Sequence, residues 1–226
     1  MKKIFTFFVA AMCCVTLLAE TQTYTNVTVD GIKYLIDNGT TPQQATVLNS
    51  SGSFDEERSK YTGDIVLPET IKDGTITYVV NGIAQYAFIE ASITSIELPA
   101  QMEQICYHAF ADCAQLTSIT CLRGSKTEAP GVPVFVNPSL ETIPASDVFS
   151  GVDPTIPVYV PDAVVNDYKT SPWGAFFTNI LPLSQKPTTG INQVPVNEKV
   201  TKQIVDGQLL IERNGQLFNA QGARVK

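Results

Sequence analysis

The sequence is poor in the side chains that most often carry out catalysis. Its 226 residues include one histidine, His108, and one tryptophan, and 16% of the residues are charged. A Ser/His/Asp or Cys/His site would therefore have to use His108, with Cys106 two residues away. Cys106, His108 and Cys113 lack a fourth ligand at a zinc-finger spacing, and no glycine-rich phosphate-binding loop is present. We therefore expect no enzymatic activity, no metal and no cofactor.

Positively charged residues are also scarce. The chain has 15 lysines and arginines against 22 aspartates and glutamates, which gives a net charge of −7 at pH 7. A negatively charged surface repels the phosphates of nucleic acids and anionic membrane surfaces. The charge balance therefore argues against nucleic acid as a partner.

The sequence contains one long hydrophobic run, from Ile4 to Ala19, which follows two lysines. The run is short for a membrane span, and a basic start with a small residue at the end is typical of a secretory signal peptide. We therefore predict a signal peptide at residues 1–19, with a retained anchor as the alternative. A lipoprotein is disfavoured, because Met12 precedes Cys13 where a small residue is required. The mature protein is then expected to have no membrane span and to be secreted or on the outer cell surface, with the periplasm as an alternative.

Cysteine is scarce in the remaining chain, which keeps Cys106, Cys113 and Cys121. An odd number leaves at least one thiol unpaired in an exported protein. Cys113 follows an Ala-Phe pair at a position expected to face inward, so we interpret it as a buried free thiol. A bridge from Cys121 to either of the other two is left open by the spacing. We expect no dependence on disulfides.

The most informative feature that is present is a repeat. Ile83–Phe88 recurs as Ile105–Phe110, and Ile93–Ile96 recurs as Leu116–Ile119, at offsets of 22 and 23 residues. A period in this range indicates a solenoid, in which each unit buries its apolar face against its neighbours. His108 stands where the first copy has a tyrosine, so we interpret it as a packing or surface residue rather than a catalytic one.

Four short segments have the period-2 pattern of a strand, with two inward apolar residues around one outward residue. Three of them end in a proline, which cannot donate to a continuing ladder. The segments are Ile65–Pro68, Ile96–Pro99, Ile119–Leu122 and Val158–Pro161. Stacked in parallel, they would present a row of outward residues that we call the outer stripe and predict to be the binding face. Its members are Asp64, Val66, Ser95, Glu97, Ser118, Thr120 and Tyr159.

The segments before the repeats are predicted to be rich in β structure. Residues 20–62 are expected to form a β-rich N-terminal cap, because Val27–Ile36 contains two alternating runs around Asp30-Gly31. A second hairpin is expected within Lys72–Val80, with Asp73-Gly74 at its tip.

The second half of the chain is less regular. Residues 123–150 are rich in proline, glycine and serine and are interpreted as an interruption, and Asp162–Phe177 is expected to contain a short closing helix. Residues 184–203 have the composition of a linker. Residues 204–226 are predicted to form a β-hairpin tail around Asn214-Gly215.

The repeats resemble those of the BspA-type leucine-rich-repeat family, which is common in surface proteins of the Bacteroidetes and some mucosal protists. The family unit is approximately apolar-Gly-x-x-Ala-Phe followed by Leu-x-x-Ile-x-Leu-Pro, and Ala84 and Cys106 stand at its glycine positions. The resemblance extends over about residues 24–183, with the repeat domain itself at 63–183. The tail resembles the end of the sorting domains of the Bacteroidetes type IX secretion route, although it is shorter. A plain accessory hairpin is the alternative.

Together these observations predict an α/β repeat solenoid: a short, irregular leucine-rich-repeat domain with a β-rich cap and a hairpin tail. The resemblance implies a secreted or cell-surface, adhesion-like module that binds an extracellular or host protein, and we place this binding on the outer stripe. One alternative is a carbohydrate-binding surface protein that stacks glycans on exposed aromatic residues. The residues considered for that role are Tyr24, Tyr61, Tyr159 and Trp173. A structural spacer is the other alternative.

Overall fold

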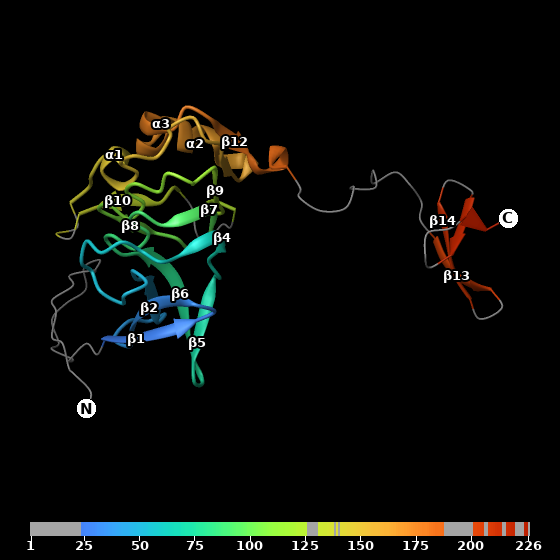
Figure 1. The fold of residues 1–226 in the computed structure, drawn as a ribbon, viewed down its shortest axis with the longest axis horizontal. Helices are drawn as coiled ribbons and strands as arrows, with labels where there is room; N and C mark the ends of the chain where they lie inside the picture. The colour runs from blue at the N-terminus through green and yellow to red at the C-terminus, as the bar shows by residue number, and fades with distance from the viewer. Residues whose placement is uncertain are drawn as a thin grey trace. The chain divides into compact units, whose positions relative to one another are not determined.

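The structure is a computed structural model that describes residues 24–125, 131–137, 139, 141–187, 201–205, 208–213, 216–219 and 224–225 (Figure 1). The chain divides into two compact units, Met1–Lys186 and Pro187–Lys226. The signal peptide predicted at residues 1–19 lies outside the described residues, as does most of the predicted linker.

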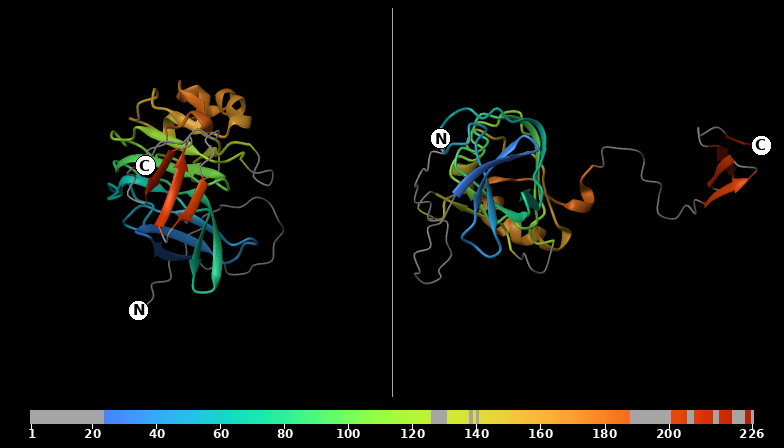
Figure 2. Two further views of the ribbon diagram at one scale, coloured as in Figure 1. Left: turned by 90° about the vertical axis from the view of Figure 1, so that its right-hand side faces the viewer. Right: turned by 90° about the horizontal axis from the view of Figure 1, so that it is seen from below.

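The first unit contains two sheets whose central strands run parallel (Figures 1 and 2). The seven-stranded sheet has the order β1-β2-β3-β6-β8-β10, and β5 pairs with β6. Its strands are β1 (Tyr24–Val29), β2 (Ile32–Asp37), β3 (Gln44–Val47), β5 (Thr70–Asp73), β6 (Ile76–Ile83), β8 (Gln104–Cys106) and β10 (Val134–Val136). The five-stranded sheet has the order β12-β11-β9-β7-β4. Its strands are β4 (Thr62–Val66), β7 (Ser92–Leu98), β9 (Ser118–Cys121), β11 (Val158–Val160) and β12 (Ile180–Pro182).

Helices contribute little to this unit, so the expected α/β character is corrected to a strand-rich repeat fold. The described helical segments have three to six residues each. They are α1 (Ala145–Val148), η1 (Asp162–Val164), α2 (Val165–Thr170), α3 (Pro172–Phe176) and η2 (Leu183–Gln185). The closing helix expected over Asp162–Phe177 is therefore divided into η1, α2 and α3, and Ser171 caps the last of these from just before its proline.

The repeat is a strand-turn-strand unit that places one strand in each sheet. β8 leads through a turn into β9, and β6 and β10 lead in the same way towards β7 and β11. The four strands predicted to stack are β4, β7, β9 and β11, and each pairs in parallel with the next. That part of the sequence prediction is confirmed.

Both predicted hairpins near the repeats are present. β1 and β2 pair antiparallel around Asp30 and Gly31, whose φ values of 49° and 81° suit a two-residue hairpin turn. β5 and β6 pair antiparallel with Gly74 and Thr75 in the loop, one residue later than the predicted tip.

A column of phenylalanines fills the core between the turns. The rings of Phe88 and Phe110 stack with their centroids 5.1 Å apart, and those of Phe110 and Phe149 stack at 5.2 Å. The backbone follows the same repeat, because Phe88 N–H donates to the carbonyl of Ala109 at 2.8 Å and Phe110 N–H donates to that of Val148 at 3.0 Å. The 22-residue alignment is confirmed, whereas the interpretation of residues 123–150 as a mere interruption is wrong, because Phe149 completes a third turn.

Each of these turns also contains a residue in the left-handed region of backbone conformation. Glu90, Asp112 and Gly151 occupy equivalent places, with φ values of 52°, 55° and 75°. A Cβ on Gly151 would clash with the Asp112 carboxylate. Space distinguishes Gly151 from the other two places, because glutamate and aspartate adopt the same conformation there.

The second unit is a four-stranded antiparallel sheet of order β13-β14-β15-β16. Its strands are β13 (Thr201–Val205), β14 (Gln208–Arg213), β15 (Gln216–Asn219) and β16 (Arg224–Val225). β14 and β15 pair with Arg213 opposite Gln216, where a hairpin was predicted, although the turn residues themselves lie outside the described residues.

The phenylalanine column predicts a large loss of stability when one ring is removed. Phe110→Ala is expected to lower the free energy of unfolding by about 3–5 kcal/mol, because a fully buried ring leaves a cavity between two stacked neighbours. Urea denaturation followed by circular dichroism measures this change. Ile76→Ala, at a partly exposed position, is the control and should cost less than about 1 kcal/mol. Equal losses in the two variants would contradict the stacked core.

The surroundings of Gly74 and Gly151 predict different losses of stability when each is replaced by alanine. Gly74→Ala and Gly151→Ala both place a side chain at positive φ, which costs roughly 1–2 kcal/mol. Nothing lies within 4 Å of a Cβ on Gly74, whereas one on Gly151 meets Asp112. We therefore expect Gly151→Ala to be the more destabilising by at least about 1 kcal/mol in the same denaturation experiment. Similar values for both would show that the Asp112 contact relaxes freely.

Candidate functional site

The outer stripe forms two rows on one face of the five-stranded sheet. The register aligns its members strand by strand, so residues from distant parts of the sequence become neighbours. One row is Asp64, Ser95 and Ser118, and the other is Val66, Glu97, Thr120 and Tyr159. The predicted alignment of all seven residues is therefore observed.

The exposure of the stripe changes from one end to the other. Val66 is 67% exposed and Asp64 is also exposed, while Ser95, Glu97 and Ser118 are half-buried. Thr120 and Tyr159 are only 2% and 7% exposed. The expectation that every member of the stripe faces solvent is therefore wrong for Thr120 and Tyr159.

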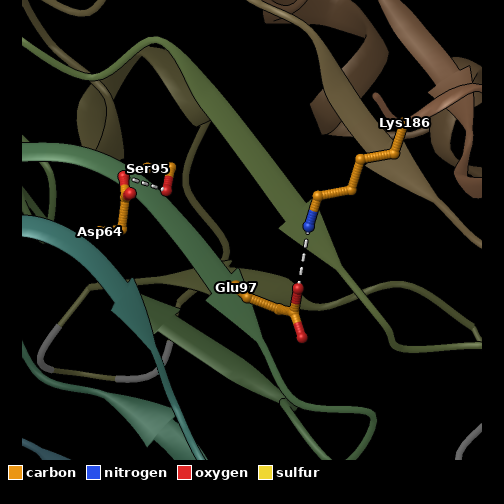
Figure 3. Close-up of polar contacts among 4 residues, drawn as sticks. All are labelled: Asp64, Ser95, Glu97 and Lys186. Atoms are coloured by element: carbon orange, nitrogen blue, oxygen red, sulfur yellow. Dashed lines mark hydrogen bonds and ion pairs between the residues drawn. The ribbon is translucent and has the colours of Figure 1, made fainter. Parts of the chain in front are cut away.

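The chain itself covers this end of the stripe. Lys186 Nζ lies 3.0 Å from Glu97 Oε2 and forms an ion pair with it (Figure 3). Lys186 follows β12 and η2 at one edge of the sheet, whereas Glu97 lies on β7, three strands away. The segment and the Lys186 side chain together therefore reach across the width of β11 and β9, which carry Tyr159 and Thr120.

A second contact holds the covering segment at its start. The Ser184 N–H donates to Asp162 Oδ1 at 3.0 Å. Hydrogen bonds from Ser184 are the main reason that the pKa of the Asp162 carboxyl is lowered. The lowered pKa keeps this carboxyl ionised. The segment Ser184–Lys186 is thus attached to η1 through Asp162 and to β7 through Glu97.

The uncovered end of the stripe presents a carboxylate beside an apolar side chain. Asp64 accepts a hydrogen bond from Thr94 Oγ1 at 2.6 Å. It accepts another from Ser95 Oγ at 2.7 Å (Figure 3). These hydroxyl donors lower the pKa of Asp64 from its usual range. No lysine or arginine of the described residues forms an ion pair with Asp64. We call Asp64, Val66 and Ser95 the open end of the stripe.

The residues considered for catalysis have ordinary structural roles. His108 is half-buried and its ring stacks on that of Tyr107 with centroids 3.7 Å apart. It shares a left-handed conformation with Tyr86, with φ values of 52° and 59°. This equivalence supports the interpretation of His108 as a packing or surface residue of the repeat.

The three described cysteines are free thiols. Cys113 is buried, as predicted, and its Sγ donates to the carbonyl of Phe88 at 2.9 Å, while Cys121 Sγ accepts from the Tyr168 hydroxyl at 3.1 Å. Burial raises the pKa of Cys113 to about 12 and those of Cys106 and Cys121 to about 11. Because the thiolate is the reactive form, these side chains are unreactive near neutral pH.

Within the described part of the chain, no group of three or more His, Cys, Asp or Glu side chains could hold a metal ion. A depression of about 330 Å³ lies beside Arg58, Glu90 and Asp112, and another of about 510 Å³ lies between α1 and α3. Neither contains His108 or a cysteine. A search of the described residues for a helix long and apolar enough to cross a membrane found none.

Most of the aromatic residues considered as glycan platforms are inaccessible. Tyr61, Tyr159 and Trp173 are buried, and Tyr24 is half-buried. Trp173 packs at the end of the phenylalanine column, where its Nε1 donates to the carbonyl of Pro133 at 3.1 Å. The carbohydrate alternative needs these side chains to be exposed, and three of the four are buried.

Comparison with known proteins places the repeat in a family. Residues 69–153 match the model described as "BspA type Leucine rich repeat region (6 copies)". No curated protein matches the sequence at a significant level.

Two solved structures are similar to the chain at low identity. A leucine-rich repeat protein from Bacteroides capillosus ATCC 29799 is 19% identical, with a TM-score of 0.37 over 60% of this chain and 97% of that one. A leucine rich cell surface protein from Faecalibacterium prausnitzii A2-165 is 13% identical, with a TM-score of 0.39 over 91% of this chain and 61% of that one. Residues 69–153 are therefore a BspA-type leucine-rich-repeat region, as the resemblance in the sequence predicted.

Proposed function

We propose that the first unit is a non-enzymatic, adhesion-like module that binds an extracellular or host protein through the open end of the outer stripe. One observation carries this proposal: a carboxylate that forms no ion pair with a described residue lies beside a largely exposed valine on the same sheet. Asp64 supplies the charge and Val66 the apolar surface. Because parallel strands fix both residues, binding would lose little conformational entropy.

In this proposal the first unit has the shape of a short, capped solenoid. The strand-turn-strand units stack as the coils of a short solenoid, with β1, β2 and β3 as an N-terminal cap on the seven-stranded sheet. The aromatic cluster around Trp173 closes the other end. A signal peptide at residues 1–19 would place the module outside the cell or on its surface, and the second unit would serve as an accessory or sorting tail.

The arrangement of rings favours a protein over a carbohydrate partner. Flat sugar rings need exposed aromatic faces that lie in one plane. The half-exposed rings of Tyr86 and Tyr107 are instead inclined by 81°, and those of Tyr107 and His108 cover each other. A spacer role without any ligand is the second candidate, and the same binding experiment tests it.

The first test is a binding screen of residues 20–226 on parallel arrays of matrix proteins and glycans. We expect a protein ligand whose affinity falls at least about tenfold in Asp64→Lys, because the change replaces an attractive charge with a repulsive one. Asp167→Lys makes the same charge change at an exposed position on α2 and is the matched control, with no expected effect. Binding to a glycan instead of a protein, or no binding on either array, would overturn the proposal. No binding on either array would favour the spacer role.

The covered end of the stripe gives a separate prediction. Thr120→Val conserves the shape of a side chain that is 2% exposed, so it should change the affinity for the protein ligand by less than about twofold. Ser95→Ala removes a hydroxyl at the open end, and with it a hydrogen bond to Asp64, so it should weaken binding. Equal effects of the two variants would show that the covering segment moves away when the partner binds.

A further inference from the structure

The five-stranded sheet ends in a strand that has only one neighbour. β4 pairs with β7, and no described strand pairs with its other side. Leu67 N–H donates to the carbonyl of Glu97 on β7, so the backbone groups of Leu67 face β7. Backbone groups alternate along a strand, so those of Asp64 and Val66 point away from β7. The open edge therefore offers two N–H donors and two carbonyl acceptors.

Side chains along this edge strand reach solvent. Thr62, Asp64 and Val66 are exposed. The seven-stranded sheet differs, because β3, β2 and β1 continue it beyond β6 (Figures 1 and 2). One of the two sheets is thus extended at this end of the repeats, and the other stops at β4.

We propose that the free edge of β4 pairs with an extended segment of the partner protein. That segment carries a lysine or arginine opposite Asp64 and an apolar residue beside Val66, two positions apart. The two side chains share one face of the sheet, so a segment with the same alternation fits both. Main-chain bonds would supply affinity, and the cation would supply selectivity. This inference rests on the proposed function and names the kind of segment that the open end of the stripe binds.

A second copy of this chain fits the edge less well. Two antiparallel β4 strands centred on Asp64 would place two carboxylates opposite each other, which is unfavourable. Centred on Ile65, they would place each carboxylate opposite Val66. Neither arrangement supplies a cation, and each chain carries a net charge of −7 that adds repulsion. The charge at the edge therefore selects a basic partner segment over self-association.

The test uses residues 20–226 and two fluorescent, capped heptapeptides, TVKVVTS and its reverse STVVKVT, which present the pattern to β4 in parallel and antiparallel orientation. Titration by fluorescence anisotropy measures affinity, and amide hydrogen exchange reports on Asp64 and Val66. We expect one peptide to bind and to protect both amides. The peptide with glutamate in place of lysine should bind about tenfold more weakly.

Two variants test separately how the backbone at Val66 and the charge of Asp64 contribute to peptide affinity. Val66→Pro removes an N–H that faces the open edge and not β7, so the fold should persist, as thermal melting will show, while peptide affinity falls at least about tenfold. Asp64→Lys should reverse the preference between the lysine and glutamate peptides. Unchanged affinity in both variants, or unprotected Asp64 and Val66 amides at peptide saturation, would overturn the inference. So would a dimer that Val66→Pro dissociates, because a second copy would then occupy the edge.

The protein ligand from the array distinguishes this inference from the proposed function. A ligand lost in Asp64→Lys and in Val66→Pro supports both. A ligand lost in Asp64→Lys but retained in Val66→Pro would leave binding through Asp64 standing, and it would overturn strand pairing and the apolar role of Val66. A ligand retained in both variants would contradict both.

Discussion

The stacking of one phenylalanine per repeat is the interaction on which the rest of the structure depends. Phe88, Phe110 and Phe149 set the separation of successive turns, and the backbone bonds between those turns follow from it. Each turn joins a strand of one sheet to a strand of the other, so fixed turns also fix the register of both sheets. The rows of the outer stripe are aligned because of this buried column, although no stripe residue contributes to it.

Outward positions are consequently available for other contacts. Glu97 forms an ion pair with Lys186, which draws the segment after β12 over two strands. Both partners are about one-third exposed, and exposed ion pairs contribute little to stability. The contact matters more for position, because it decides which part of the sheet face meets solvent. Asp64 has hydroxyl partners and forms no ion pair with any described residue, so its charge is available to a ligand.

The sequence predicted the parts of the fold that depend on local alternation. The predicted inward residues of β7 (Ile96 and Leu98) and of β9 (Ile119 and Cys121) are buried, because a shift of one position would expose them instead. Phe149 was missed because its turn lies 39 residues after Phe110, beyond the regular period, and Val148 replaces alanine before it. The burial of Thr120 and Tyr159 was not predictable, because the alternation places both residues outward. The ion pair of Lys186 with Glu97 on the same face joins segments that no repeat relates.

The edge of β4 combines features that oppose indiscriminate pairing with groups that permit a selective one. A register shift between Gly63 and Asp64 and the proline at residue 68 keep the regular edge short, and short, charged edges resist aggregation. Between these limits, Asp64 and Val66 still present unpaired backbone groups. A short edge gives few main-chain bonds, so side chains must contribute a large share of the discrimination. An ionised carboxylate next to an exposed valine therefore favours a basic, extended segment and rejects acidic strands, including a second copy of this chain.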